Sequence, residues 1–454
     1  MAQLVPARQR SIGGIAAAEH RPSIAGVTGS RLRTCDDCGL LLRLPSLSPG
    51  VDCGCPRCAA VLYRHSQSPR GTPLALAVTS LILCAVTFTT PFLTIRMLGR
   101  ARGSTVESGA WAFLDDGLWI LSLVLVATVV LVPLLRLSLR LVVLGGLALR
   151  RPPPWLFRPL CWHGRLSAWS MLEIFLFGAL VSTVRLAGLA EVQFGPAVYG
   201  LAAVVLAMVV ADAAFEPQAV WDEMEARGVR AFEPQADQDA MKTRGTPAVP
   251  SMLGCPCCRR VTLASPGTPC ARCGTPLDPR KPASVSRTWA LIVAAAILYV
   301  PANLYPVMTI VSLGRGAPHT IIGGIFEFAA AGYWPLALMV CLASVVVPLL
   351  KLVGLSVMLL QIHGGSTHAL QQRTKLYRLI EVLGRWSMID IFVVAVLVAL
   401  VRFGGLASIT AEVGAACFGA VVILTMLAAE TFDPRLMWDA AEAGSGDRQR
   451  GLGR

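Results

Sequence analysis

Charged side chains are scarce in this chain. Only 15% of its 454 residues are Asp, Glu, Lys or Arg, whereas soluble proteins carry about 25%. With 55% hydrophobic residues and a mean hydropathy of +0.62, the chain contains several apolar runs of roughly 18 residues or more. An ordinary soluble domain is therefore excluded, and the alternating segments of a transmembrane barrel are absent. We predict an all-α polytopic membrane protein.

Other absences narrow the function. The sequence has no G-x-x-x-x-G-K-[ST] motif, so any energy for transport must come from a gradient or a partner. Its histidines form no cluster, and His163, His319, His363 and His368 fall in predicted loops, so we do not expect an enzyme. The net charge of +13 is explained by arginines that flank membrane segments, and no nucleic-acid partner is predicted.

Internal repetition organises the rest of the sequence. Motifs of the first half return in the second half in the same order: TPFLTI/YPVMTI, VPLLRL/VPLLKL, WSMLEIF/WSMIDIF and FEPQAVWD/FDPRLMWD. Each copy starts with a short cysteine-rich head and continues into a run of apolar segments. We therefore expect two tandem four-helix transmembrane modules, each preceded by a small cysteine head.

The repeats set the expected domain boundaries. These are a disordered basic tail (1–34), the first head (35–65), transmembrane module 1 (73–215), a linker (216–250), the second head (251–280), transmembrane module 2 (288–431) and a disordered tail (440–454). Helices are predicted over 73–97, 117–149, 166–187 and 196–215, and over 288–312, 331–361, 384–403 and 411–431. The connections near 98–116 and 313–330 are expected on the side opposite to the heads.

Basic residues in short loops set the expected orientation. The loop after the second helix of each module should be cytoplasmic, because positive charge is retained on that side. The residues concerned are Arg150, Arg151, Arg158 and Arg165, and Arg373, Lys375, Arg378 and Arg385. Four crossings return the chain to its starting side, so we predict modules in parallel orientation in the bacterial inner membrane, with both termini and both heads cytoplasmic. The N-terminus lacks the continuous apolar stretch of a signal peptide.

Ten of the 14 cysteines lie in the two heads. Paired C-x-x-C is the zinc-ribbon pattern, in which two tight turns present four thiolates to one Zn²⁺. The expected ligands are Cys35, Cys38, Cys55 and Cys58, and Cys255, Cys258, Cys270 and Cys273. We predict one zinc ion in each cytoplasmic head, two in total, with a structural role, because four thiolates leave no position for a substrate.

Several cysteine assignments stay open in the sequence. A Cys₄ iron site and redox-active thiols are alternatives to zinc. Cys53 and Cys257 are surplus to the two pairs, and Cys53 could replace Cys55 as a ligand. The isolated cysteines are predicted to be small apolar packing residues: Cys84, Cys161, Cys341 and Cys417.

Two cations occupy the same motif inside predicted membrane helices. Lys351 stands in VPLLKL and Arg136 in VPLLRL, where a charge costs about 2.5–3.5 kcal/mol and is usually paired or functional. Lys351 and Asp390 are predicted at matching depth on consecutive antiparallel helices, so they can pair. Arg136 and Glu173 repeat this arrangement in module 1.

In module 2, more polar residues surround the predicted pair of Lys351 and Asp390 than surround the corresponding pair in module 1. Ser344 and Thr425 stand where module 1 has the apolar Val129 and Met208. We predict an intramembrane polar network in module 2 and a pair with a mainly structural role in module 1. The members of the predicted network are Ser344, Lys351, Ser387, Asp390 and Thr425. The alternative is that both pairs only lock helices together.

The third predicted helix of each module ends at an arginine. Arg185 and Arg402 stand at equivalent places on the side opposite to the heads. They are predicted to be anchors near the lipid headgroups.

The heads, the duplication and the membrane motifs carry a family resemblance. VPLLRL/VPLLKL and WSM-[LI]-[ED]-IF, each behind a four-cysteine head, resemble the paraquat-inducible protein A family over about residues 35–440. The resemblance implies an inner-membrane subunit of a bacterial envelope lipid-transport system. Its implied partners are a periplasmic MCE-domain tunnel protein and a phospholipid or other membrane lipid.

Two functional hypotheses follow. In the first, alternating protonation of the Lys351–Asp390 network drives lipid transport. In the second, the protein is a zinc- or redox-responsive membrane scaffold or sensor without transport activity.

Overall fold

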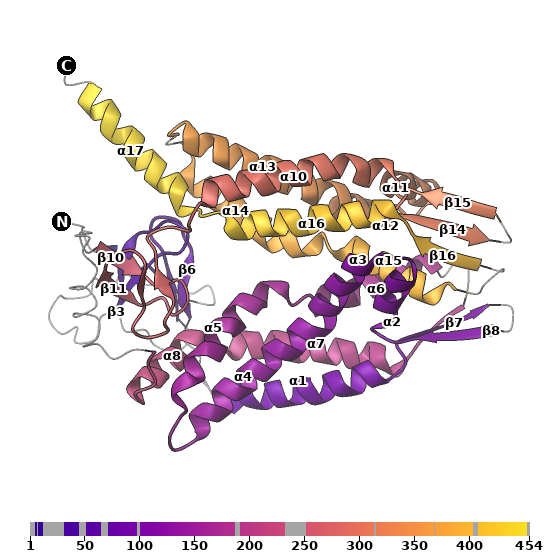
Figure 1. Cartoon of the computed structure of the whole chain (residues 1–454), viewed down its shortest axis with the longest axis horizontal. Coiled ribbons are helices and arrows are strands. Elements are labelled where there is room, and N and C mark those ends of the chain that lie inside the picture. Colours follow the sequence, from indigo (N-terminus) through magenta and orange to yellow (C-terminus); the bar gives the residue numbers. More distant parts are fainter. Residues whose placement is uncertain are drawn as a thin grey trace.

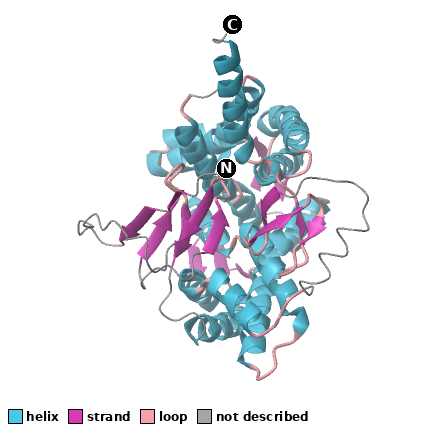
Figure 2. Cartoon of the chain, turned by 90° about the vertical axis from the view of Figure 1, so that its left-hand side faces the viewer, coloured by secondary structure: helices cyan, strands magenta, loops and turns pink. Residues whose placement is uncertain are grey.

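Two helical bundles lie side by side in the computed structural model, with small strands at both ends (Figure 1). The structure describes residues 5–6, 8–11, 31–44, 51–64, 71–97, 100–186, 191–231, 251–312, 315–366, 368–402 and 407–451. The strands around the cysteines lie at one end, and two β-sheets lie at the other. Viewed from the cysteine end, these strands lie between the two bundles (Figure 2).

The first bundle contains the helices between the two cysteine heads. They are α1 (Gly71–Thr89), α2 (Ser108–Asp115), α3 (Trp119–Leu125), the π-helix η1 (Val126–Leu131), α4 (Val132–Ala148), η2 (Pro154–Leu156), α5 (Phe157–Leu166), η3 (Ser167–Trp169), α6 (Leu172–Leu186), α7 (Pro196–Ala214) and α8 (Pro217–Ala226).

The second bundle repeats this order. Its helices are α10 (Ser284–Leu304), α11 (Ile321–Ala330), α12 (Trp334–Cys341), the π-helix η4 (Leu342–Val346), α13 (Val347–His363), α14 (Leu370–Trp386), α15 (Ile389–Leu400), α16 (Val413–Thr431) and α17 (Arg435–Gly451).

Eight helical segments of the described chain are long and apolar enough to cross a membrane. They are Gly71–Thr89, Trp119–Ala148, Pro154–Leu186, Pro196–Ala214, Ser284–Leu304, Trp334–His363, Leu370–Leu400 and Val413–Thr431. The protein is therefore a multi-pass, mostly helical membrane protein. The seventh span starts earlier than predicted from sequence, because the amphipathic helix α14 leads directly into α15.

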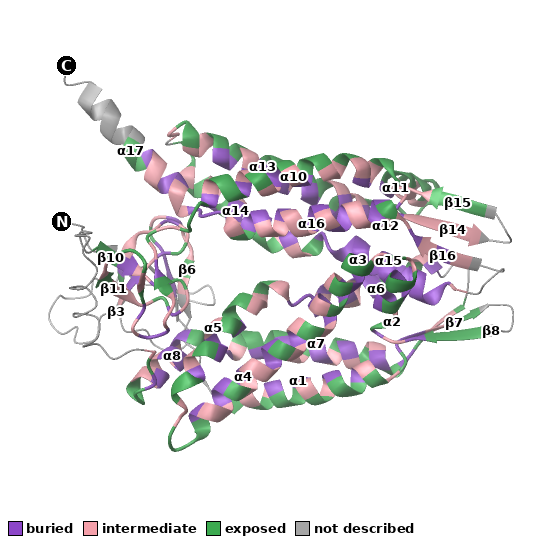
Figure 3. Cartoon of the chain, in the orientation of Figure 1, coloured by how far each residue is buried: buried purple, intermediate pink, exposed green. Residues whose placement is uncertain are grey.

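Burial divides the spans into outer and inner helices (Figure 3). On α1, the exposed residues Val78, Ile82 and Val86 recur every four positions, which places them on one lipid-facing stripe. By contrast, every residue of α15 is buried. This helix packs against α6 and α2 of the first bundle, so one apolar core continues through both bundles.

Sheets replace part of two predicted helices and the loops that follow them. The first sheet has the order β8 (Arg100–Ser104), β7 (Leu93–Met97), β9 (Glu191–Phe194), and the second has β15 (Arg315–His319), β14 (Met308–Ser312), β16 (Ala407–Ala411). The helices predicted over 73–97 and 288–312 therefore end early. In each, a proline shortly after the helix end (Pro91 or Pro306) blocks continuation, and the following Thr-Ile suits a strand.

Each cysteine head consists of short strands joined by tight turns. The first head has β1 (Val5–Pro6), β2 (Arg8–Ser11), β3 (Arg31–Thr34), β4 (Leu41–Leu44), β5 (Val51–Gly54) and β6 (Val61–Arg64). The second has β10 (Ser251–Gly254), β11 (Val261–Ala264), β12 (Thr268–Pro269) and β13 (Pro276–Leu277).

The first head packs against the second bundle. Arg378 of α14 donates from Nε to Asp37 Oδ2 at 2.6 Å and from Nη2 to Cys58 Sγ at 3.3 Å. Trp438 of α17 belongs to the same apolar cluster as the head's cysteines, and the Arg57 guanidinium lies 4.3 Å from its ring centroid.

The second head packs against the first bundle in the same manner. Arg272, which matches Arg57 in the repeat, donates to Asp222 Oδ1 of α8 at 2.8 Å and lies 5.7 Å from the ring of Trp221. Each head thus contacts the bundle that it does not precede in sequence. The FEPQAVWD/FDPRLMWD motif supplies the docking tryptophan in both cases.

Three expectations about irregular segments need correction. Helix α8 lies in the predicted linker 216–250, and α17 begins at Arg435 and extends into the predicted disordered tail 440–454. A tryptophan of each helix packs against a cysteine head. The sequence around the helix does not reveal this contact, so the stability of the helix could not be predicted from it. Strands β1 and β2 lie in the predicted tail 1–34, where they pair with β4 and β5. The rest of the linker, 232–250, and the end of the chain, 452–454, lie outside the described residues.

One cysteine assignment is also corrected. Cys161 of α5 forms a disulfide with Cys257 of the second head, so it is not a simple packing residue. The bond joins residues 96 positions apart in sequence, and it ties the head to the first bundle.

Candidate functional site

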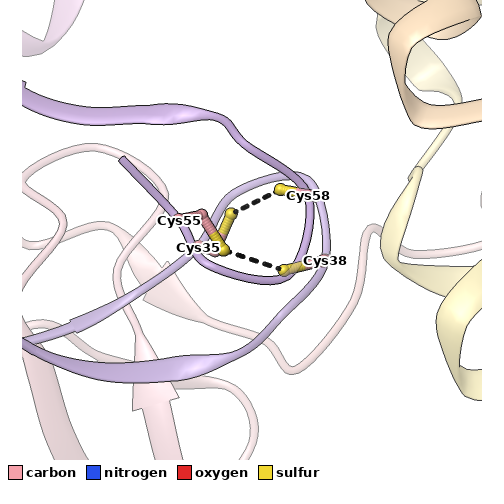
Figure 4. A group of neighbouring side chains, drawn as sticks. All are labelled: Cys35, Cys38, Cys55 and Cys58. Carbon is pink, nitrogen blue, oxygen red and sulfur yellow. Dashed lines mark hydrogen bonds between the residues drawn. The ribbon is translucent and has the colours of Figure 1, made fainter. Parts of the chain in front are cut away.

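Two buried groups of four cysteines can hold metal ions. Cys35, Cys38, Cys55 and Cys58 converge in the first head (Figure 4), and Cys255, Cys258, Cys270 and Cys273 converge in the second. The closest sulfur pairs are 3.5 and 3.6 Å apart in the first group and 3.3 and 3.6 Å apart in the second. Zn–S bonds of about 2.3 Å in a tetrahedron require sulfurs about 3.8 Å apart. The donor set and the spacing therefore fit zinc.

Tight turns create both groups. After each C-x-x-C pair, the next residue takes a positive φ, and its N–H donates to the carbonyl of the first cysteine. These residues are Gly39, Ala59, Arg259 and Gly274. Glycine adopts this conformation without strain, as the sequence suggests for Gly39 and Gly274.

Cys53 is not part of either group. It lies in β5 with its side chain fully buried, and burial raises the pKa of its thiol to about 11. The structure brings Cys55, and not Cys53, to the other three sulfurs. The alternative in which Cys53 replaces Cys55 is therefore wrong.

Lys351 is fully buried in the second bundle. Its Nζ donates to the Gly384 carbonyl oxygen at 2.9 Å, to Ser387 Oγ at 2.7 Å and to Thr425 Oγ1 at 3.3 Å. An ammonium group has three donors, so all of them find an acceptor. These acceptors are neutral, and Lys351 makes no ion pair with any residue that the structure describes.

A break between α14 and α15 provides this environment. Gly384 lies in the last turn of α14, and Asp390 lies in the first turn of α15. A helix carries partial negative charge at its C-terminus and partial positive charge at its N-terminus, so the break suits a cation beside α14 and an acid on α15. A β-carbon on Gly384 would lie 3.5 Å from Lys351 Cε, an ordinary van der Waals contact, so the lysine side chain passes directly over this residue.

Asp390 forms a separate part of the network with Ser344. The carboxylate oxygen Oδ2 contacts Ser344 Oγ, which also lies 2.7 Å from the Val340 carbonyl oxygen. Ser344 sits in the π-helix η4, an irregularity often found at functional positions. A hydroxyl has one proton. When Ser344 donates it to Val340, its contact with Asp390 requires a protonated carboxyl, so the pair has two states that differ by one proton.

The predicted direct pairing of Lys351 with Asp390 is not formed. The structure instead divides the five residues into Lys351 with Ser387 and Thr425, and Asp390 with Ser344. The helix break explains the difference, because its neutral oxygens already satisfy the ammonium. Both charged side chains lie inside the bundle, 0% and 9% exposed, and neither faces lipid.

The predicted Arg136–Glu173 pair of the first bundle is wrong. Arg136 Nη2 lies 2.9 Å from Asp212 Oδ2, and Arg140 also contacts Asp212. Glu173 instead lies 3.5 Å from Arg385 of the second bundle. The last span supplies the carboxylate because Asp212 on α7 faces α4, which the repeat pattern does not reveal.

Sequence reasoning missed most of this first-bundle cluster. Arg140 is buried and donates from Nε to His163 Nε2 at 3.3 Å, although His163 was expected in a loop. Two signals were available. Arg140 follows Arg136 by one helical turn. Asp212 interrupts an apolar span, and an acid inside a membrane helix usually has a partner.

A cavity of about 300 Å³ lies where the two bundles meet. Its wall is mostly apolar and comes from both bundles, with Val393, Val394 and Leu397 of α15 on one side. The ionisable and hydroxyl groups on the wall are Arg185, His319, Thr320, Glu327, Tyr333, Ser344 and Asp390. Lys351, Ser387 and Thr425 do not line it. The proton-dependent part of the network is therefore the part that reaches the cavity.

These features define a duplicated multi-pass membrane protein with two cysteine heads that could hold metal ions. The chain belongs to the paraquat-inducible protein A family, whose family model (PqiA) matches residues 71–225 and 285–442. The matched ranges contain the membrane spans of both bundles, and the resemblance seen in the motifs is confirmed.

Known relatives cover nearly the whole chain. It is 33% identical over 413 residues to the intermembrane transport protein PqiA of Escherichia coli (strain K12), which spans 89% of this chain and 95% of that protein. It is 30% identical to the lipophilic envelope-spanning tunnel protein A of the same strain, over 90% of this chain and 92% of that protein. A probable intermembrane transport protein of Haemophilus influenzae is 25% identical over 90% of this chain and 96% of that protein. No solved structure matches. The names of these family members describe transport components and not enzymes, in agreement with the prediction from the sequence.

Proposed function

We propose that the protein is the inner-membrane subunit of a bacterial system that moves a phospholipid or other membrane lipid across the envelope. Its relatives are named for transport between membranes and for an envelope-spanning tunnel, which supports this role. Because this chain is built of membrane spans, it needs a partner to bridge the periplasm. A periplasmic MCE-domain protein is the proposed partner.

One observation carries the mechanism: Asp390 and Ser344 lie on the wall of an apolar cavity between the bundles. When Asp390 is protonated, its carboxyl can donate to Ser344, and the Ser344 hydroxyl can donate to the Val340 carbonyl. When Asp390 is deprotonated, the Ser344 hydroxyl donates to the carboxylate instead and its hydrogen bond to Val340 is lost. Alternating protonation would thereby change the helix packing at η4, next to the cavity. Lys351 holds the break between α14 and α15 in place while the acid titrates.

The membrane orientation is part of the proposal. We place the heads and both termini in the cytoplasm, because the basic loops of both bundles lie on the same side as the heads. The eight clustered cysteines would hold one zinc ion per head. Zinc would stabilise a domain that has little apolar core of its own.

Replacement of Asp390 by Asn tests the mechanism. Asp390→Asn keeps the size of the side chain and removes its titration, so lipid transfer between vesicles should fall at least about 10-fold. Glu173→Gln, at the equivalent position of the first bundle, is the matched control and should retain transfer. Both variants should retain the elution volume and zinc content of the parent protein. Full transfer by folded Asp390→Asn protein would rule out the coupling.

A zinc- or redox-responsive scaffold is the second candidate, and the Cys161–Cys257 disulfide favours it. The bond joins a metal-binding head to a membrane bundle, so a change in thiol state would change how the head is held. Cys258→Ser distinguishes the two functions when the protein remains folded. A sensor loses its response to zinc or oxidant while basal lipid transfer continues, whereas a transporter without a sensor shows no such response to lose.

A further inference from the structure

Arg185 and Arg402 stand at equivalent positions but have different surroundings. Each follows the repeated WSM-[LI]-[ED]-IF motif by the same number of residues. The Arg402 guanidinium lies 2.8 Å from both Asp115 Oδ2 and Asp116 Oδ1, and it donates to the Ala112 carbonyl at 2.7 Å. The second bundle's arginine is therefore neutralised by the first bundle.

Arg185 reaches the other way, from the first bundle into the cavity of the second. Its guanidinium lies 4.5 Å from the Phe328 ring centroid, and its buried Nε has no hydrogen-bond partner. Among the described residues it forms no ion pair. The undescribed segments that precede strands β8, β9, β15 and β16 in the sequence contain no acidic residue: 98–99, 187–190, 313–314 and 403–406.

An alignment of the two repeats explains why its carboxylate partners are missing. The segment WAFLDDGLW (111–119) corresponds to FEFAAAGYW (326–334), since both contain a glycine with positive φ, at Gly117 and Gly332, followed by a helix that starts at tryptophan. Alanines stand in the second copy where the first has Asp115 and Asp116. Ala331, the counterpart of Asp116, lines the cavity beside Arg185.

The other ionisable groups of the cavity have partners of their own. Glu327 Oε2 lies 3.2 Å from His319 Nδ1, and Asp390 contacts Ser344. The Arg185 guanidinium is thus the charged group on the wall without a hydrogen bond or an ion pair. Asp390 and Glu327 act on it only through longer-range electrostatic attraction, and a cation in an apolar site is costly until an anion binds directly to it.

We infer that Arg185 binds the phosphate of a lipid headgroup in this cavity, an inference that rests on the proposed lipid-transport function. A guanidinium matches the oxygens of a phosphate with two parallel hydrogen bonds. The apolar wall formed by α15 accepts the first part of an acyl chain. A volume of about 300 Å³ is small for a ligand site, so it holds a headgroup and not a whole two-chain lipid. The first bundle supplies the anchor with its neighbours Val184 and Leu186, and the second supplies most of the remaining wall.

Competition between two lipids with the same chains tests this assignment. Full-length protein is incubated with equimolar dioleoylphosphatidylglycerol and dioleoylglycerol, and the bound lipids are quantified by native mass spectrometry. The parent protein should prefer the phospholipid. Arg185→Gln should reduce this preference about 10-fold or more, the effect of losing a charge-assisted hydrogen bond. Arg185→Lys should retain part of it.

Two further variants use the repeat itself. Ala331→Asp gives Arg185 the carboxylate that Arg402 has, so it should abolish the preference without removing the arginine. Arg402→Gln removes the paired arginine and should leave the preference unchanged. The elution volume and zinc content of each variant report folding, and Arg185→Lys keeps the test decisive if Arg185→Gln does not fold.

The outcomes separate this inference from the function on which it rests. An unchanged preference in folded Arg185→Gln or Ala331→Asp protein overturns the phosphate anchor and leaves lipid binding intact. Parent protein that binds neither lipid contradicts the proposed transport function itself. A third arm adds inorganic phosphate. If millimolar phosphate displaces the phospholipid and binds without it, the ligand is free phosphate, and the assignment to a lipid is wrong.

Discussion

The two bundles share their helix order and their motifs, yet they treat buried charge in opposite ways. In the first bundle, Arg136 and Arg140 both contact Asp212, so the cations are closed off by a carboxylate. In the second, Lys351 has only neutral acceptors, and the side-chain hydrogen-bond partner of Asp390 is a hydroxyl, with Arg185 acting on it only at longer range. At the other end the contrast is reversed, because Arg402 of the second bundle is paired and Arg185 of the first bundle is not.

This difference teaches how a duplicated membrane fold can divide its tasks. A paired buried charge contributes to one fixed structure, and removal of either partner destabilises it. A buried acid without a cationic partner can gain or lose a proton, and an arginine without an acid can bind an anion. We therefore expect changes of the paired charges to affect stability and changes of the unpaired ones, Lys351, Asp390 and Arg185, to affect transport.

The largest expected effect comes from the cysteine heads, because each half of the chain has one and a ligand of each can be changed separately. Cys55→Ser and Cys258→Ser should each remove about one of the two proposed zinc ions, because each takes away one of four thiolate ligands. Each should also destabilise its head, since structural zinc contributes on the order of 10 kcal/mol to folding of small domains. Inductively coupled plasma mass spectrometry measures the metal-to-protein ratio.

The controls are the surplus cysteines. Cys53→Ser and Cys257→Ser should leave the zinc content unchanged, since neither sulfur lies among the four convergent ones of its head. A loss of zinc in Cys257→Ser would show that the cluster of Cys161, Cys257 and Cys273 binds the metal instead.

The next effect distinguishes the buried cations. Lys351→Met should reduce lipid transfer at least about 10-fold. The variant lacks the ammonium group that donates to the Gly384 carbonyl and the Ser387 hydroxyl, which lie at the break between α14 and α15. Arg136→Met should leave transfer per folded molecule within about 2-fold, while it lowers the thermal midpoint of unfolding. Equal loss of transfer in both variants would break the distinction between the bundles.

The smallest expected effect concerns Asp212. Asp212→Asn leaves two guanidiniums without an anion and should lower the free energy of unfolding by about 1–3 kcal/mol. This expected loss of free energy is smaller than that for breaking a fully buried ion pair, because the Asp212 side chain is 39% exposed and water screens the charges. A chemical denaturation series in detergent measures the change, and Ser344→Ala serves for comparison as the loss of a single hydroxyl. Abolished transfer with unchanged stability would move the functional site to the first bundle.

Local patterns in the sequence predicted much of the molecule. The apolar runs indicated the eight spans, and the C-x-x-C spacing indicated which eight cysteines converge. Repeated motifs located Lys351 and Asp390 inside the bundle. Each of these conclusions depends on neighbours in sequence or on one helix, where spacing determines geometry.

The missed features all involve groups far apart in sequence. The sequence pattern predicts a pairing of Arg136 with Glu173, because these residues occupy the positions of Lys351 and Asp390 in the repeat. In the structure the partner of Arg136 is Asp212, from the last span of the first bundle. The exchange of the heads between bundles and the Cys161–Cys257 bond have no local signal either.

The sequence by itself determined that this is a duplicated, membrane-spanning protein with two four-cysteine heads, because hydrophobicity and short-range spacing dictate those properties. Only the tertiary structure decided which charges are paired and which are left open. Two helices that carry opposite charges at equal depth can still face other neighbours, and the choice depends on how both bundles pack together. That packing brings Arg185 and Asp390, from different halves of the chain, to the wall of one cavity.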